Sequence, residues 1–152
     1  MKTRIVTRAI IYKNNKILLS RNQGYDFWYP GGGEWEPEED LLQCATREAF
    51  EETGHKIKVL DLMYVQEFYI SKEERNLELF FLAEPLSAST TDHTHEDMDK
   101  GGHVQVEENR WFGEEEMKTV KVYPEFIRER FWQNIRNIDK SRKIFFKNYQ
   151  VE

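Results

Sequence analysis

The distribution of apolar and polar residues predicts a chain that begins with a pair of strands. Residues 4–12 are rich in β-branched and apolar side chains, and residues 16–20 form a second run of the same kind. Between them, Asn14 and Asn15 can adopt the left-handed backbone of a two-residue turn. We therefore predict an antiparallel hairpin at the start of the chain.

Later apolar runs predict the remaining strands. Residues 57–70 carry two such runs and predict a strand with a bend or bulge, and the polar residues 71–76 predict a turn. Residues 77–84 predict a strand that is buried on both faces at its centre and that Pro85 ends. Residues 104–112 predict the last strand.

Two segments have the spacing of amphipathic helices. The first ends at Gly54, a residue suited to a left-handed C-terminal position, and its apolar face consists of Leu41, Leu42, Ala45 and Ala49. The second lies within residues 123–138, begins near Pro124 and has an apolar stripe of Phe126, Ile127, Phe131, Ile135 and Ile138. Residues 113–119 predict a short helix with three acids in its first turn.

Composition indicates one globular domain. The chain has 152 residues, of which 39% are hydrophobic and 14% aromatic, and no stretch approaches the ~18 apolar residues of a membrane span. The first residues lack the hydrophobic region of a signal peptide, so we expect a cytoplasmic protein that does not associate with membranes. Cys44 cannot form an internal disulfide, and we expect it to be a small buried residue.

The net charge of −6 disfavours a general nucleic-acid-binding protein. Residues 121–152 carry eight Lys and Arg against four Asp and Glu, which leaves −10 on the rest of the chain. This basic region could touch RNA, but a solvated helix face is the favoured interpretation.

A glycine-rich and acidic stretch, residues 31–55, carries the candidate chemistry. It reads GGGEWEPEEDLLQCATREAFEETGH. On a helix, Glu48, Glu51 and Glu52 fall within about one third of the circumference, where their charges repel one another. A glutamate-rich helix face is usually just solvated. A divalent cation is the alternative that would make this face a site.

The spacing of this stretch resembles the signature of the Nudix hydrolases, G-x5-E-x7-R-E-U-x-E-E-x-G-U, in which U is a bulky aliphatic residue. Its fixed positions are Gly33, Glu39, Arg47, Glu48, Glu51, Glu52 and Gly54. Ala49 occupies the first aliphatic position. His55 replaces the second, and Glu38 replaces a glycine that is common in the family.

The resemblance implies an α+β fold, a Nudix-type α/β/α sandwich with a mixed β-sheet between helices. We expect one Nudix domain over residues 1–138, followed by an extension of uncertain structure over residues 139–152. The implied reaction is hydrolysis of the diphosphate linkage in a nucleoside diphosphate joined to a group X, as in a nucleotide sugar, ADP-ribose or a (deoxy)nucleoside triphosphate. Two alternatives are a non-catalytic nucleotide-binding regulatory module and a pyrophosphohydrolase of RNA caps or 5′ ends.

The resemblance also implies roles for individual residues. Glu51 and Glu52 would hold Mg²⁺, for which Mn²⁺ could substitute, and Glu48 would be a ligand or the base that orients water. The Gly32 carbonyl would be a backbone ligand, and one of Glu107 and Glu108 an additional one, with Glu107 preferred. Glu39 and Arg47 would brace the loop against the helix, together with Gly33 and Gly54 as structural positions.

Substrate contacts are expected from an arginine and from aromatic residues. Arg21 stands where relatives often place a phosphate-facing basic residue, although an ordinary surface arginine is an equal alternative. Tyr25 and Phe27 are candidates for stacking on a nucleobase, whereas for Trp28 and Trp35 we favour a place in the core. The expected partner is a small nucleotide, with nucleic acid disfavoured and a homodimer left open.

Residues 86–103 lack periodicity and contain His93, His95 and His103 among several acids. A zinc site is one interpretation, but no cysteine or helical spacing supports it. We favour a mobile loop near the substrate.

Overall fold

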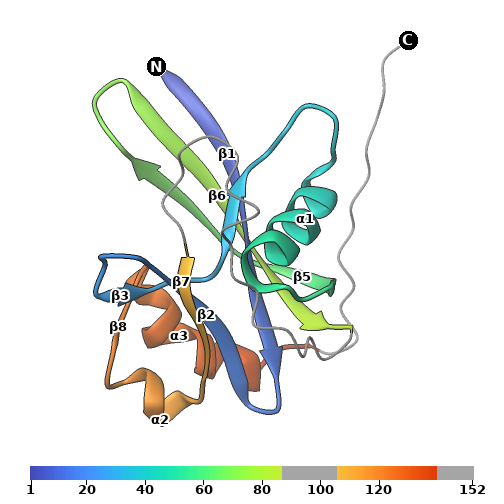
Figure 1. Ribbon diagram of the computed structural model, residues 1–152, viewed down its shortest axis with the longest axis vertical. Helices are drawn as coiled ribbons and strands as arrows, with labels where there is room; N and C mark the ends of the chain where they lie inside the picture. Colours follow the sequence, from blue (N-terminus) through green and yellow to red (C-terminus); the bar gives the residue numbers. More distant parts are fainter. Residues whose placement is uncertain (87–105, 140–152) are drawn as a thin grey trace.

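The structure is a computed structural model that describes residues 1–86 and 106–139, except for the side chain of Glu107 (Figure 1). Its main sheet has the strand order β5, β6, β1, β2, β7, and β4 also pairs with β1. These strands are β1 (Lys2–Lys13), β2 (Lys16–Asn22), β4 (Gly32–Glu34), β5 (Ile57–Tyr69), β6 (Glu74–Pro85) and β7 (Val106–Phe112). Because β1 and β6 are parallel while the other pairs of this sheet are antiparallel, the sheet is mixed, as the family resemblance implies.

Helices cover both faces of the sheet. On one face, α1 (Leu41–Thr53) packs on a core made of Ala9, Ile11, Leu18, Ala49, Ile57 and Ala83. On the other face, α2 (Glu114–Met117) and α3 (Glu125–Arg136) pack on a larger core whose fully buried members include Ile10, Ile17, Leu19, Phe80, Met117, Ile127 and Phe131. The α/β/α sandwich is therefore confirmed. None of the described helices is long and apolar enough to cross a membrane.

The predicted hairpin turn and bulged strand are confirmed. Asn14 and Asn15 have φ angles of 53° and 59°, the left-handed backbone that lets β1 return directly as β2. The pairing of β5 with β6 shifts register twice, so the long apolar segment that begins at Ile57 is one irregular strand.

Helix α1 begins and ends as its sequence indicates. Asp40 caps the N-terminus in a reciprocal pair with Gln43, and Gly54 ends the helix with a φ of 73°. Cys44 is fully buried, as expected, and its sulfur accepts a 3.1 Å hydrogen bond from the Thr7 hydroxyl on β1. These contacts fix the rotation of α1 about its axis and thereby the direction of its glutamates.

Two sequence predictions were wrong. The strand at residues 104–112 is not the last one, because β8 (Lys121–Val122) pairs in parallel with β3 (Phe27–Trp28). Trp28 is buried in the core, but Trp35 is 36% exposed. The Trp35 indole N–H donates to the Glu39 carbonyl at 2.6 Å, so this ring lies over the turn before α1 and outside the core.

Candidate active site

The candidate site is built on β4, a short glycine strand beside β1. The Gly31 carbonyl accepts from Ala9 N–H at 3.0 Å, and Trp35 N–H donates to the Ile5 carbonyl at 2.8 Å. Gly32 lies opposite Arg8 in a pair of residues that are not hydrogen-bonded to each other. The N–H and carbonyl of Gly32 therefore point away from β1. The Gly32 N–H donates to Oε2 of Glu52 at 2.8 Å, and the Gly32 carbonyl lies on the same edge of the strand.

Glycines allow the helix carboxylates to pack directly on this strand. A Cβ atom at Gly31 would lie 2.5 Å from Oε2 of Glu52, and one at Gly33 would overlap the Glu48 carboxyl group. A Cβ at Gly32 would overlap the β1 backbone on the other side. Any side chain here would therefore separate the acidic face of α1 from the main chain of β4.

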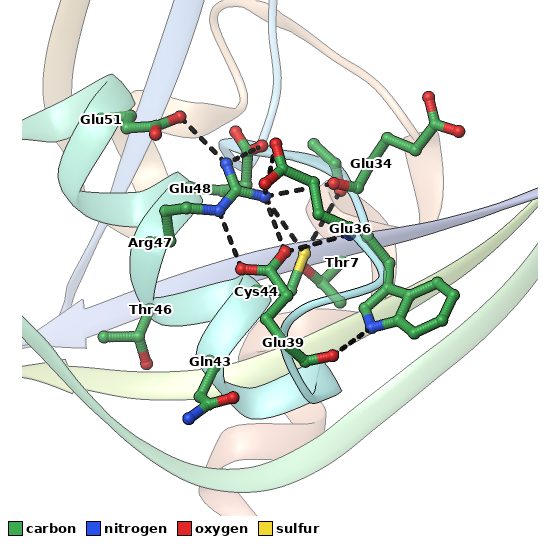
Figure 2. Close-up of polar contacts among 12 residues, drawn as sticks. Thr7, Glu34, Glu36, Glu39, Gln43, Cys44, Thr46, Arg47, Glu48 and Glu51 are labelled. Atoms are coloured by element: carbon green, nitrogen blue, oxygen red, sulfur yellow. Dashed lines mark hydrogen bonds and ion pairs between the residues drawn. The ribbon is translucent and has the colours of Figure 1, made fainter.

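Arg47 holds the acidic side chains around this strand in place (Figure 2). Its Nε and Nη2 donate to the two Glu39 oxygens at 2.9 and 2.8 Å, and Nη1 donates to Glu48 at 2.8 Å and Glu51 at 3.1 Å. Nη2 also donates to the Glu34 carbonyl at 3.2 Å. One guanidinium thus joins the loop, the strand and the helix, which is the bracing arrangement expected for Glu39 and Arg47.

Glu52 is the least compensated carboxylate of the group. The pKa of Glu52 is raised to about 8, mainly by burial, with a smaller contribution from the charges of Glu48 and Glu51 and against the opposing effect of the positive charge of Arg8. Burial also raises the pKa of Glu48, although Arg47 opposes the shift. Two carboxylates that resist ionisation side by side are the environment that a bound cation would relieve.

The carboxylates of α1 face protein donors. Glu48 and Glu51 contact Arg47, and Glu52 contacts Gly32. Within residues 1–86 and 106–139, no three acidic, histidine or cysteine side chains are close enough together to form a ready-made metal site. The available donors are oxygens, including the Gly32 carbonyl. An all-oxygen set with excess negative charge fits a hard divalent cation such as Mg²⁺. The His-rich segment with His93, His95 and His103 lies outside the described residues.

Strand β7 presents different side chains to the two faces of the sheet. Glu108 contacts Arg21 at 3.4 Å and Arg110 at 2.8 Å. The next residue, Asn109, accepts from the Ser20 hydroxyl at 2.6 Å and donates to the Glu52 carbonyl at 2.8 Å. Glu108 therefore points to the face opposite α1. The bond from Asn109 to α1 is a part of the site that sequence reasoning missed, since an asparagine in a strand has no distinguishing pattern.

The three predicted substrate contacts are grouped together. Arg21 donates to the Tyr25 carbonyl at 3.3 Å and its guanidinium lies over the Trp28 ring. Tyr25 is 46% exposed and meets Phe27 edge to face, with ring centroids 5.3 Å apart. Phe27 also packs on the exposed Tyr123, so an aromatic surface lies beside Arg21.

A mixed sheet between helices, with a glutamate-bearing helix docked on a glycine strand, is the arrangement that the resemblance to the Nudix hydrolases implies. A sequence model of the NUDIX domain matches residues 2–130, and the chain belongs to this family. It is therefore a Nudix pyrophosphohydrolase. No curated protein matches the sequence.

Solved structures show the same fold. A NUDIX hydrolase from Nitrosomonas europaea is 22% identical, with a TM-score of 0.62 and 78% of each chain covered. A UDP-X diphosphatase is 22% identical, with a TM-score of 0.69, 90% of this chain covered and 64% of that one. An ADP-ribose pyrophosphatase from Streptococcus suis is 18% identical, with a TM-score of 0.59 and 79% of each chain covered.

The raised pKa of Glu52 predicts how metal-free stability depends on pH. Between the ordinary carboxyl value of 4.5 and about 8, the folded protein keeps a proton that the unfolded chain releases. The free energy of unfolding should therefore fall as pH rises through this window, by at most about 1.4 kcal/mol per pH unit for one proton. Glu52→Gln should flatten this slope, as measured by urea unfolding in EDTA at several pH values. The exposed Glu38→Gln should keep it. Equal slopes for the parent and Glu52→Gln would contradict the assignment.

Proposed function

We propose that this protein hydrolyses the diphosphate linkage of a nucleoside diphosphate joined to a second group, with Mg²⁺ as the cofactor and Mn²⁺ as a substitute. The observation that carries the proposal is the direct packing of Glu48 and Glu52 on the glycine strand, with Gly32 bonded to Glu52 at 2.8 Å. This places carboxylates and a backbone carbonyl on one small, negatively charged surface, which needs a cation before it can accept a polyanion.

The cation site would consist of Glu48, Glu51, Glu52 and the Gly32 carbonyl, with Glu107 as an additional ligand. When bound, the cation would neutralise diphosphate charge and acidify a water molecule. Glu48 is the residue we assign to accept the water proton, because its raised pKa makes it a better base near neutral pH. Arg47 keeps Glu48 and Glu51 in position from one side while Glu39 anchors the guanidinium from the other.

The substrate class is consistent with two of the similar structures. One is called a UDP-X diphosphatase and another an ADP-ribose pyrophosphatase, and both names describe nucleoside diphosphate derivatives. At about one fifth identity this likeness concerns the fold, so it supplies compounds to test. The aromatic surface of Tyr25 and Phe27 is our proposed contact for the base, with Arg21 at its edge.

A Mg²⁺-dependent screen tests the function. The panel is ADP-ribose, nucleotide sugars, dinucleoside polyphosphates and (deoxy)nucleoside triphosphates, with phosphate, diphosphate and nucleoside monophosphate as the products scored. We expect turnover of at least one compound, and a fall of about a hundredfold or more in Glu52→Gln, or about 2.7 kcal/mol of barrier. Glu38→Gln, which removes an exposed carboxylate from the loop that precedes α1, is the matched control and should stay within about twofold.

The screen also separates the alternatives. Nucleotide binding without turnover of any compound would favour a regulatory module over an enzyme. Capped and 5′-triphosphorylated RNA are added to the panel for the RNA alternative, which preferential action on them together with strongly salt-dependent binding would favour. Full activity of Glu52→Gln would show that the proposed site is wrong.

The ion pairs of Glu108 give a second prediction. Glu108 is already paired with Arg21 and Arg110 on the face away from α1, so of the two glutamates that the sequence offers we propose Glu107 as the ligand. Glu107→Gln should lower Mg²⁺-dependent turnover by about tenfold or more, whereas Glu108→Gln should have a mild effect. Steady-state kinetics over a range of Mg²⁺ concentrations check this. Equal, mild losses for both would exclude a ligand in this strand.

A further inference from the structure

Arg8 lies beside the glycine strand on the face of the sheet opposite α1. Its neighbour Thr7 points toward α1, where its hydroxyl reaches Cys44, so the Arg8 side chain leaves β1 on the other face. Two residues along the strand, Ile10 is fully buried in the core beneath α3, but the Arg8 side chain keeps 22% of its surface exposed. Arg8 is thus at the margin of the helix-covered region.

Three contacts fix the Arg8 guanidinium. Nη1 donates to the Pro30 carbonyl at 3.2 Å, immediately before the glycines, and Nη2 contacts Glu78 at 3.4 Å. The charged group also lies over the Tyr29 ring, 5.7 Å from its centroid. A guanidinium has more N–H donors than these two hydrogen bonds use within the described part of the chain. Arg8 is therefore held in one place with donors to spare.

Glu78 is a buried acid with no place in the metal chemistry. Only 5% of the residue is exposed, and its second carboxylate oxygen accepts from the Gln66 side chain at 3.2 Å. A buried carboxylate is costly unless it is paired, and here the pairing holds Arg8 and Gln66 side by side. This arrangement orients Arg8, because both Glu78 oxygens are already engaged.

Gly32 separates Arg8 from the candidate metal ligands. A Cβ atom at Gly32 would lie 2.9 Å from Cγ of Arg8, while the Gly32 N–H on the other side donates to Glu52. Arg8 also interacts electrostatically with Glu52 across the strand, because its positive charge lowers the pKa of Glu52 against the effect of burial. A diphosphate bound through a cation on the carboxylates of α1 would need to extend only past this one strand to meet a guanidinium.

We propose that Arg8 binds a phosphate oxygen of the substrate and that Glu78 is its positioning residue. The inference rests on the proposed function, because it takes the substrate to be a diphosphate bound through the cation that Glu48, Glu51 and Glu52 would hold. A planar guanidinium with free donors is suited to phosphate. Arg8 differs from Arg21, the arginine named in the sequence analysis, because its contacts lie at the glycine strand itself.

Two measurements test the role of Arg8. Arg8→Gln should raise KM for the hydrolysed diphosphate compound by about tenfold while changing kcat less. It should weaken calorimetric binding of methylenediphosphonate, a non-hydrolysable diphosphate, in the presence of Mg²⁺ by a similar factor. Arg8→Lys, which keeps the charge but loses the planar fork, should fall between the parent and Arg8→Gln, and it serves as the test if Arg8→Gln does not fold by circular dichroism. Arg75→Gln is the matched control, because Arg75 is also ion-paired on the same sheet but to the exposed Glu67.

The role of Glu78 is tested by combining Glu78→Gln with Arg8→Gln. Glu78→Gln should raise KM in the parent background and have no additional effect in Arg8→Gln, because a positioning residue acts only through its partner. Additive effects would overturn the positioning role. If Arg8→Gln matches Arg75→Gln in both KM and diphosphonate binding, the proposal for Arg8 is wrong while the proposed function stands. If the parent hydrolyses no diphosphate compound, the proposed function is wrong, and diphosphonate binding alone then decides for or against Arg8.

Discussion

The whole site depends on one contact, the hydrogen bond from the Gly32 N–H to Glu52 across the boundary between β4 and α1. It is possible only because three consecutive glycines let a helix carboxylate reach the main chain of a strand. The burial of Cys44 and Ala49 against β1 and its neighbours sets the rotation of α1 that directs Glu48 and Glu52 to this point. The fold therefore delivers its acids to the strand edge by ordinary core packing.

The burial that accompanies this contact imposes an electrostatic cost. Burial beside other carboxylates raises the pKa of both Glu48 and Glu52, so the metal-free site is less favourable when they are ionised. Arg47 offsets part of this cost by binding Glu48, Glu51 and Glu39 at once. It does not contact Glu52 in the described structure, where the compensating charge comes from Arg8 on the far side of the strand. The site therefore lies between two arginines: Arg47 binds Glu48 and Glu51, and Arg8 partly compensates the charge of Glu52.

Sequence reasoning was most successful where a pattern has a local cause. The Asn14–Asn15 turn and the end of α1 at Gly54 each follow from residues close together in the chain. Helix spacing predicted that Glu48, Glu51 and Glu52 share one face, because spacing on a helix fixes direction. The family resemblance implied a brace by Arg47 and Glu39, and the two side chains are hydrogen-bonded.

Most of the features that sequence reasoning missed depend on contacts between segments that are distant in the chain. Trp35 was expected in the core from its apolar ring, yet a bond to the Glu39 carbonyl holds it on the surface. Strand β8 is too short for periodicity and exists because β3 is there to pair with it. Arg8 and Glu78 are 70 residues apart, and neither has a local signal that predicts their pairing. Such contacts become visible only once the sheet order is known.

The central claim is that the acidic face on the glycine strand is a divalent-cation site, and direct metal binding tests it most simply. Mn²⁺ binding can be followed by the loss of the free-ion electron paramagnetic resonance signal, near pH 8, for the parent and for Glu52→Gln. The account predicts specific binding to the parent that Mg²⁺ displaces, and binding at least about tenfold weaker in Glu52→Gln, or about 1.4 kcal/mol. Binding of equal strength in both proteins, or none to the folded parent at millimolar Mn²⁺, would contradict it.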